Sequence, residues 1–329
     1  MKMKKLLISI VILVLLGIAS IYIPIPGYMV ITPGEMLNTK EMIQVDQGTK
    51  SKGDYYITSF EQGPANAISY LFSFTGIIKV EPMPPLDEQK MDVEKGKADL
   101  ENSKLSAMTA AIRKAGKDVK YEHKGWEVLK DDTKYGIKKG DLLQAIDGIS
   151  LKSSEEFFLP DLIKYYEKKK VGDTVTYQIL RGEETLEVKT KLVEQNGQKI
   201  DDLNLRLSVK QKAEFQSPVK VNFKKLDLGG PSAGLMMTLD ILDELLPEDL
   251  TKGNKIAGTG TISADGKVGI IGGENYKVLS TIDTGVKVFF CPKENAKLAQ
   301  ETVKKYDIKV KVVPVATLDE AVEYLRNMK

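Results

Sequence analysis

The chain has 329 residues, 42% apolar and 29% charged, which is enough to bury a sizeable core and, by length, to form about two domains. Its 48 basic residues nearly balance its 46 acidic residues, so there is no electrostatic reason to expect nucleic acid as a partner. A single cysteine and a single histidine exclude a disulfide framework and the usual zinc clusters, and we expect no cofactor.

The N-terminus predicts a membrane anchor. The run Leu6–Ile23 carries no charge, and lysines precede it. It is long enough to span a bilayer, and positive charge is retained on the cytoplasmic side. We therefore expect a cytoplasmic tail at 1–5, a transmembrane helix at 6–23 and all later residues outside the cytoplasm. The alternative is a cleaved signal peptide with a site at Gly17-Ile18-Ala19, but the apolar run continues past it.

The next part of the chain, to about residue 120, predicts strands and then a helix. Strands are expected at Tyr28–Ile31, Met42–Val45 and Tyr55–Phe60. The stretch Glu81–Lys97 is charged and has prolines near its start, which predicts a mobile surface connection. Apolar residues at helical spacing predict a helix in Leu100–Lys114.

Residues 121–194 have the pattern of a separate, strand-rich module. Strands are expected at Trp126–Leu129 and Asp141–Ile146, followed by a helix and a hairpin with arms Thr174–Leu180 and Thr185–Leu192. A polar linker is expected at Glu194–Lys199. The last third of the chain alternates strand-like and helix-like segments, which is an α/β pattern.

Ser232 stands where a strand, a glycine-rich turn and an apolar helix follow one another. It could be a helix N-cap or part of an anion-binding turn. It could instead be a nucleophile, because glycines allow close approach of a substrate and N–H groups at a helix start can stabilise an oxyanion. Nothing places the only histidine, His123, or the thiol of Cys291 in a nucleophile–histidine pair, which leaves lysine as the base.

The segment Gly258–Ile282 singles out one lysine. A predicted hairpin turns at Asp265-Gly266 and leads to two glycines and a helix whose first turn holds Lys277. Desolvation and the positive potential of a helix N-terminus would lower its pKa, so that it could take a proton from serine. Thr259 could orient it. The alternative, a solvated surface lysine, is what base rates favour.

Three ordered motifs resemble the proteolytic domain of Lon-type peptidases: Gly230-Pro231-Ser232-Ala233-Gly234, Thr259-Gly260-Thr261-Ile262 and Gly272-Gly273-Glu274-Asn275-Tyr276-Lys277. The resemblance implies that Ser232 is the nucleophile, Lys277 the general base and Thr259 a support for the lysine. Gly230, Pro231, Gly272 and Gly273 would shape the site. Gly53–Phe60 and Leu100–Ala115 are similar to an early strand and a helix of that family.

Residues 121–194 resemble a PDZ domain of the bacterial protease type. The resemblance rests on Gly136-Ile137-Lys138-Lys139-Gly140-Asp141 and on Val171-Gly172-Asp173. PDZ domains bind extended peptides by strand addition. The resemblance therefore implies a peptide-binding edge, for which the candidates are Gly125, Trp126, Glu127 and Val128.

As a whole, the chain resembles the membrane-anchored PDZ-domain Lon-like serine peptidases of Gram-positive bacteria, the SepM type. This implies an α/β (α+β) Lon-type proteolytic domain in two segments, 28–120 and 200–329, with an inserted β-rich PDZ domain and one N-terminal transmembrane helix. The implied function is a serine endopeptidase with a Ser-Lys dyad, placed at the cell membrane with its catalytic domain extracytoplasmic. Its partners would be a peptide or protein substrate and, because Lon-type domains tend to form rings, further copies of itself.

Two departures from the Lon pattern qualify this resemblance. Gly229 stands where typical Lon enzymes have an acidic residue, which leaves the geometry of the site open. The chain has no G-x-x-x-x-G-K-[ST] motif, so we expect cleavage without ATP. The main alternative is a catalytically idle, membrane-bound PDZ scaffold that binds peptides, and a further one is an anion-binding module at Gly229–Gly234.

Overall fold

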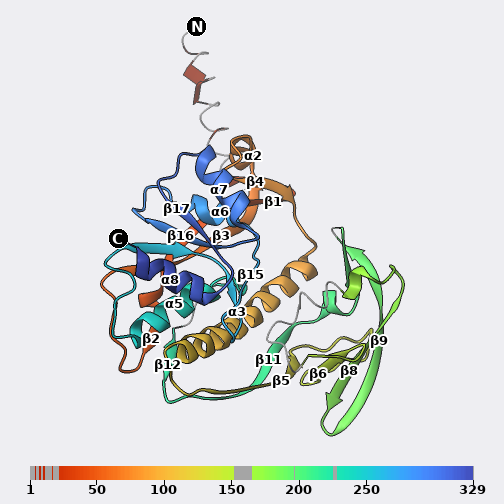
Figure 1. The fold of residues 1–329 in the computed structure, drawn as a ribbon. Helices are drawn as coiled ribbons and strands as arrows, with labels where there is room; N and C mark the ends of the chain where they lie inside the picture. The colour runs from red at the N-terminus through yellow and green to blue at the C-terminus, as the bar shows by residue number, and fades with distance from the viewer. Residues whose placement is uncertain are drawn as a thin grey trace.

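The six-stranded sheet at the centre of the larger unit joins N-terminal and C-terminal strands (Figure 1). The structure is a computed structural model that describes residues 22–151, 165–195, 197–224 and 228–328, with residues 4, 7, 8, 10, 11 and 17 before them. In spatial order the strands are β17 (Lys311–Val315), β16 (Val288–Pro292), β13 (Lys255–Gly258), β3 (Asp54–Asn66), β1 (Pro24–Asn38) and β4 (Lys79–Pro82). Strands β17, β16, β13 and β3 are parallel, whereas β1 is antiparallel to both β3 and β4.

Helices cover both faces of this sheet, as the sequence of β16 requires. Val288 and Phe290 of β16 pack into one core cluster, and Phe289 and Cys291 pack into another on the opposite face. A parallel strand buried on both faces reads as a continuous apolar run. The first face carries α3 (Leu86–Lys114), α5 (Gly234–Leu245) and α8 (Leu318–Asn327); the second carries α6 (Glu274–Leu279) and α7 (Ala296–Lys305). The predicted α/β layering is confirmed.

Helix α3 is much longer than predicted. It includes most of Glu81–Lys97, so the prediction of a mobile connection there is wrong. The prolines precede the helix, and the segment from Leu86 to Lys95 contains no helix breaker. Asp87 and Glu88 in the first turn also favour a helix start, because they complement the helix dipole. As a result, α3 passes beside the turn that carries Ser232.

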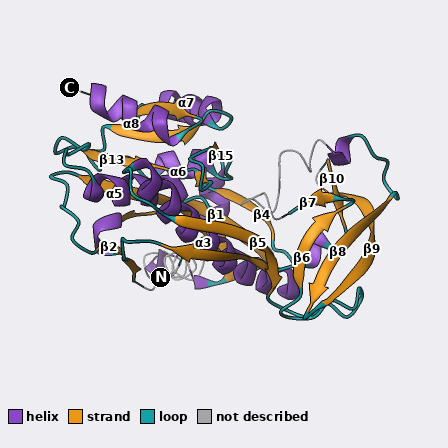
Figure 2. Ribbon diagram, turned by 60° about the horizontal axis from the view of Figure 1, so that its bottom comes forward, coloured by secondary structure: helices purple, strands orange, loops and turns teal. Residues whose placement is uncertain are grey.

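The smaller unit is a seven-stranded antiparallel sheet, set beside α3 where the two units meet (Figure 2). It contains β5 (Lys120–Val128), β6 (Leu142–Ile146), β7 (Ile149–Ser150), β8 (Thr174–Arg181), β9 (Glu184–Gln195), β10 (Gln198–Asp201) and β11 (Val209–Gln216). Its core includes Trp126, Ile146 and Tyr177. The predicted hairpin is confirmed as β8–β9, and the predicted helix falls largely on residues 152–164, outside the described residues.

The boundary after this unit differs from the prediction. Glu194–Lys199 is not a linker, because it forms the turn of a β9–β10 hairpin in which Lys199 pairs with Glu194. The chain then returns along β5 as β11, and Lys120 pairs with Gln216 at the end of that ladder. The two chain ends of the inserted unit therefore lie side by side.

The remaining elements are short. They are η1 (Thr39–Glu41), α2 (Ala67–Ser73), η2 (Asn204–Arg206) and two small sheets, β2 (Ile43–Val45) with β12 (Val221–Phe223) and β14 (Thr261–Ile262) with β15 (Val268–Gly269). The β14–β15 pair is the predicted hairpin before Lys277. The tail at 1–5 and the transmembrane helix at 6–23 fall mostly outside the described residues. Within the part of the chain that is described, no helix has the length and apolarity to cross a bilayer.

Candidate active site

Ser232 lies just before α5 and is not its N-cap. The cap position is Ala233, which makes no side-chain capping hydrogen bond. The Ser232 hydroxyl instead faces Lys277, whose Nζ donates to Ser232 Oγ at 2.8 Å. The two residues are 45 positions apart in sequence, so the fold brings together the pair that the motifs predicted.

Lys277 is buried, which contradicts the alternative of a solvated surface lysine. Only 3% of it is exposed, and it lies in α6, where its N–H donates to Gly273 O at 3.0 Å. Burial lowers the pKa of Lys277 to about 8, although the charge of Glu274 opposes the shift. An amine with this pKa is partly neutral near pH 7–8 and can accept a proton.

Thr259 contacts both members of this pair. Lys277 Nζ lies 3.3 Å from Thr259 Oγ1, and the same hydroxyl donates to Ser232 O at 3.2 Å. The N–H of Gly260 also donates to Ser232 O, at 2.8 Å. The end of β13 thus holds the backbone of Ser232 and the amine of Lys277 together, as the resemblance implied for Thr259.

The turn before Ser232 is fixed by α3, a contact that the sequence did not reveal. Gly230 has φ +88°, a left-handed conformation that favours glycine, and its N–H donates to Gly96 O at 2.7 Å. Ser103 Oγ donates to Pro231 O at 2.9 Å. A side chain at Gly96 would meet Gly229 Cα at 3.3 Å. The crowding therefore falls on Gly96, because a Cβ at Gly229 would lie 3.5 Å from Gly96 Cα, an ordinary van der Waals contact.

The N–H groups next to Ser232 point to an oxyanion site. Among the described residues, the backbone N–H groups of Ser232 and Ala233 have no hydrogen-bond acceptor. The N–H of Gly230 does not share this role, because it is used by Gly96. Unpaired N–H groups at such a position are the kind of donor that could stabilise the negative oxygen of a tetrahedral intermediate if Ser232 attacked a carbonyl group.

Phe60 is a further residue of the site that the sequence did not single out. Lys277 Nζ lies 5.7 Å from the centre of its ring. Gly273 has φ +71°, and a Cβ there would come within 2.7 Å of Phe60 Cδ1. The glycine therefore lets the ring pack against the start of α6. No contact assigns a comparable role to Gly272, which is exposed.

A cavity of about 700 Å³ leads to Ser232 and Lys277 between β3, α3 and the Gly229–Ala233 turn. Strand β13 pairs with β3 only as far as Ile57. Beyond that point, most residues of β3 as far as Pro64 line the cavity, and in the described part of the chain no strand pairs with this edge of β3. An extended peptide could therefore add to β3 beside the Ser232 hydroxyl.

The predicted peptide-binding edge of the smaller unit is wrong. Trp126 and Glu127 pair with β6 on one side and with β11 on the other. Val128 pairs with Val209, and its N–H and carbonyl are also bonded to the segment at Gly140–Asp141. Gly125 packs tightly against Leu143 O. These residues form an interior part of the sheet, because β11 returned to a strand that the sequence presented as an edge.

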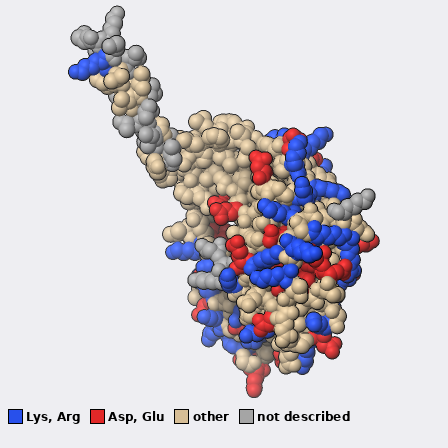
Figure 3. All heavy atoms as spheres, turned by 90° about the vertical axis from the view of Figure 1, so that its left-hand side faces the viewer, with Lys and Arg blue, Asp and Glu red and all other residues tan. Residues whose placement is uncertain are grey.

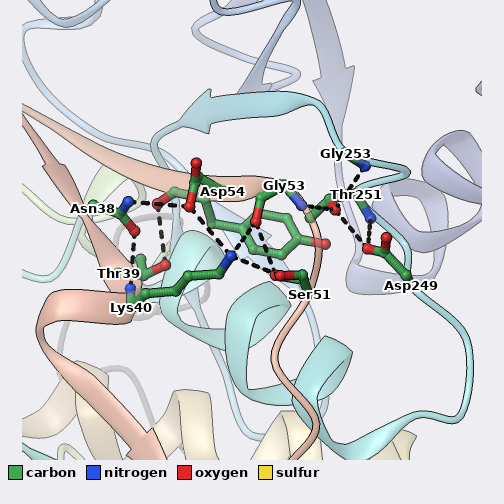
Figure 4. A network of polar contacts seen from close by, with 10 residues as sticks. Asn38, Thr39, Lys40, Ser51, Gly53, Asp54, Asp249, Thr251 and Gly253 are labelled. Carbon is green, nitrogen blue, oxygen red and sulfur yellow. Dashed lines mark hydrogen bonds and ion pairs between the residues drawn. The ribbon is translucent and has the colours of Figure 1, made fainter.

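A second polar cluster lies at the far end of α5 (Figure 4). Lys40 donates to Ser51 O at 2.8 Å and pairs with Asp54 at 3.2 Å, while Gly53 N–H donates to Thr251 Oγ1 at 2.8 Å. Close by, α5 buries the carboxyl groups of Asp240, Asp243 and Glu244. Burial raises the pKa of Asp240 to about 7 and that of Asp243 to about 6.

Each of the two units is similar to a known protein family. Residues 219–327 match the family model of the Lon protease (S16) C-terminal proteolytic domain, and residues 126–192 match that of a PDZ domain. The chain combines a Lon-type proteolytic domain with a PDZ domain. Within the first match lie both Ser232 and Lys277, so the predicted resemblance to Lon-type peptidases is confirmed.

Among relatives of the Lon-type domain, the Lon protease of Trichlorobacter lovleyi is 37% identical over 94 residues, or 29% of this chain and 11% of that protein. The Lon protease of Metamycoplasma arthritidis is 37% identical over 100 residues, or 30% of this chain and 12% of that protein. The chain therefore matches only about a tenth of these relatives. A solved PDZ domain of an SdrC-like protein from Listeria monocytogenes is 27% identical, with a TM-score of 0.18, over 25% of this chain and 90% of that one.

Proposed function

We propose that this protein is a serine endopeptidase of the PDZ-domain Lon-like, SepM type, which cleaves extracytoplasmic peptides or membrane-protein tails without ATP. The observation that carries the proposal is the 2.8 Å contact between a serine hydroxyl and a lysine amine that is only 3% exposed. A buried amine held against a serine, at a helix start and at the end of an open cavity, is the arrangement that nucleophilic catalysis needs.

Acylation begins when neutral Lys277 takes the proton of Ser232 and Oγ attacks the carbonyl carbon of the scissile bond. The N–H groups of Ser232 and Ala233 hold the resulting oxyanion. Lys277 then gives its proton to the leaving amine, the C–N bond breaks, and an ester to Ser232 remains. Lys277 then takes a proton from water, and the hydroxide attacks this ester. The bond between the acyl carbon and Ser232 Oγ breaks, Lys277 returns the proton to Oγ, and the second product leaves as a carboxylic acid.

The geometry also supports a substrate that is extended. The free edge of β3 between Ile57 and Pro64 runs along the cavity, where a peptide strand would gain main-chain hydrogen bonds. A folded protein cannot offer such a strand without unfolding locally, and the chain has no phosphate-binding loop that would couple ATP to unfolding. Peptides and unstructured tails are therefore the substrate class.

The location is part of the proposal. A helix at 6–23 with lysines before it would place the catalytic domain outside the cytoplasm, where ATP is scarce. The anchor and the ATP-independent cleavage thus fit one another.

The test is cleavage of an unstructured fluorogenic polypeptide by the full-length protein in detergent, without ATP. Wild type is expected to cut it, whereas Ser232→Ala and Lys277→Ala should be inactive, each with an unchanged thermal unfolding profile or a more stable one. Lys304→Ala, at an exposed position of α7, is the matched lysine control and should cut as wild type does.

A covalent probe locates the nucleophile independently of the substrate. A fluorophosphonate should modify Ser232, as read by mass spectrometry of the peptide that contains it. Equal cleavage by all four proteins, or probe attached elsewhere, would contradict the dyad. Peptide binding without cleavage by wild type would favour the idle scaffold.

A further inference from the structure

Helix α2 and the residue that follows it expose four large apolar side chains, those of Tyr70, Leu71, Phe72 and Phe74. It has the sequence Ala-Ile-Ser-Tyr-Leu-Phe-Ser, and none of its residues is buried. Leu71 is 66% exposed, Phe72 59% and Phe74, at the end of the helix, 79%. Most helical stability in proteins comes from packing an apolar face. An apolar helix without a buried residue therefore indicates a surface that is covered by a lipid bilayer or by another protein.

The sequence around α2 is free of charge over a long stretch. No charged residue occurs from Gln62 to Ile78. Its aromatic residues Tyr70, Phe72 and Phe74 are of the kind that is enriched where a bilayer meets water. A soluble partner usually requires charged or polar groups at the rim of its interface. The composition therefore fits a lipid surface better than a protein.

The position of α2 identifies which lipid surface this is. Pro24, the first residue of β1, pairs with Asn66, which is the N-cap of α2. The chain that follows the apolar run Leu6–Ile23 therefore begins its fold, at Pro24, directly beside this helix, and Figure 1 shows α2 close to β1. Tyr22 and Ile23 are also strongly exposed.

A lysine from another part of the chain lies beside the uncharged segment that contains α2. Tyr306 OH donates to Thr75 O at 2.8 Å, which ties the end of the helical segment to the end of α7. The ammonium of Lys305 lies beside Gly76, where a Cβ would meet it at 2.8 Å. In Figure 3 the upper part of the body is largely uncharged, with a few acidic side chains at its edge and lysine and arginine side chains beside them. Lysine near the edge of an apolar patch is suited to lipid phosphate groups.

We propose that α2 and its aromatic flanks are a second membrane contact, which lies in the interfacial layer of the phospholipid leaflet that the N-terminal helix leaves. This inference rests on the anchor in the proposed function. The apolar side chains of Leu71, Phe72 and Phe74 enter the boundary between headgroups and acyl chains, and Lys305 stays at the level of the phosphates. A helix in this position buries its apolar face by about 5–10 Å.

The contact places the cavity close to the bilayer. Gly63 and Pro64 line the cavity, and α2 begins only a few residues later in the chain. Pro64 also pairs with Met29 of β1, another residue of the cavity wall. The bonds that the enzyme reaches are therefore those in extended segments just outside the membrane, which narrows the substrate class to juxtamembrane stretches and newly translocated peptides.

The experiment is site-directed fluorescence with the full-length protein in phosphatidylcholine–phosphatidylglycerol vesicles. The native Cys291 is fully buried, and burial raises the pKa of its thiol to about 12, so it reacts poorly with a thiol label. Phe72→Cys is labelled with a fluorophore and tested in two sets of vesicles, with nitroxide lipids that carry the quencher either at a shallow depth or near the bilayer centre. Val171→Cys, at an exposed site of the smaller unit, is the matched control, and Leu13→Cys reports on the anchor.

The expected result is about a twofold loss of fluorescence or more, from the shallow quencher for the label at 72 and from the deep quencher for the label at 13, and none from either for the label at 171. Quenching at 13 without quenching at 72 overturns this inference but leaves the anchor intact. Absence of quenching at both positions overturns both. A signal at 72 that depends on protein concentration and not on quencher lipid would show that a second copy of the chain covers α2, which also overturns the inference.

Discussion

Buried ionisable groups of opposite kind lie at the two ends of α5, a lysine amine near its start and carboxyl groups farther along. At its start, the amine of Lys277 is enclosed with Ser232 and Thr259. Farther along, the same helix buries the carboxyl groups of Asp240 and Asp243. Desolvation acts on both ends in the same way, because it favours the neutral form: it lowers the pKa of the lysine and raises the pKa values of the acids.

The difference between the ends is access. A cavity of about 700 Å³ reaches Ser232 and Lys277, whereas the buried carboxyl groups of Asp240 and Asp243 do not line that cavity. A perturbed pKa alone therefore does not mark a catalytic group. A perturbed pKa indicates a catalytic group only where a substrate can reach that group, and elsewhere the perturbed pKa affects only the stability of the fold.

The largest expected effect comes from removing the amine. Lys277→Met should lower kcat/KM by about 10³-fold or more, because among the described residues Lys277 is the side chain that is hydrogen-bonded to Ser232 Oγ. The variant should also be more stable at pH 7, by up to about 3 kcal/mol, because a desolvated amine is replaced by an apolar chain. Peptidase assays and chemical denaturation measure the two effects. A less stable variant would show that the amine contributes favourably to the fold.

At the other end, Asp240→Asn should change stability and not activity. The folded pKa of about 7 lies above the unfolded value, so the folded state binds the proton more tightly. Wild-type stability is therefore greatest below the unfolded pKa and falls as pH rises through about 7, by up to about 4 kcal/mol. Denaturation curves from pH 4 to 8 should show this loss in wild type and a smaller one in Asp240→Asn. Parallel curves would contradict the assignment.

The pH profile of cleavage should separate the two ends. Only neutral Lys277 accepts a proton, so kcat/KM should rise with pH, by about tenfold per unit below its pKa, and level off above about pH 8. Asp240→Asn should keep this profile. An activity that falls between pH 6 and 8 would indicate that the protonated lysine is the active form.

The smallest effect is expected at the support of the lysine. Thr259→Val keeps the shape of the side chain and removes the hydroxyl that contacts Lys277 and Ser232 O. We expect kcat to fall by about tenfold with little change in KM, because the hydroxyl positions the pair without touching substrate. Thr302→Val, on α7, is the matched control and should leave kcat unchanged. An unchanged kcat in Thr259→Val would remove Thr259 from the site.

The sequence predicted the elements that local patterns determine. The order of the three motifs led to Ser232 and Lys277, and alternation led to the β8–β9 hairpin. It did not predict contacts between distant segments. The residues next to Phe60 in the sequence do not indicate that it packs against Gly273, and those next to Gly96 do not indicate that its carbonyl accepts a hydrogen bond from Gly230. Both contacts form only when β3 and α3 are in place. The same cause made β5 look like an edge: its partner β11 lies some 80 residues later in the chain.

The pairing of Lys120 with Gln216 has a practical consequence for protein engineering. The chain leaves the proteolytic domain along β5 and returns to it along the neighbouring strand β11. Removal of the inserted unit would therefore leave two chain ends that a short turn can join. Different recognition modules could be fitted onto the same pair of strands. The paired ends of β5 and β11 are therefore a natural site for exchanging the inserted domain.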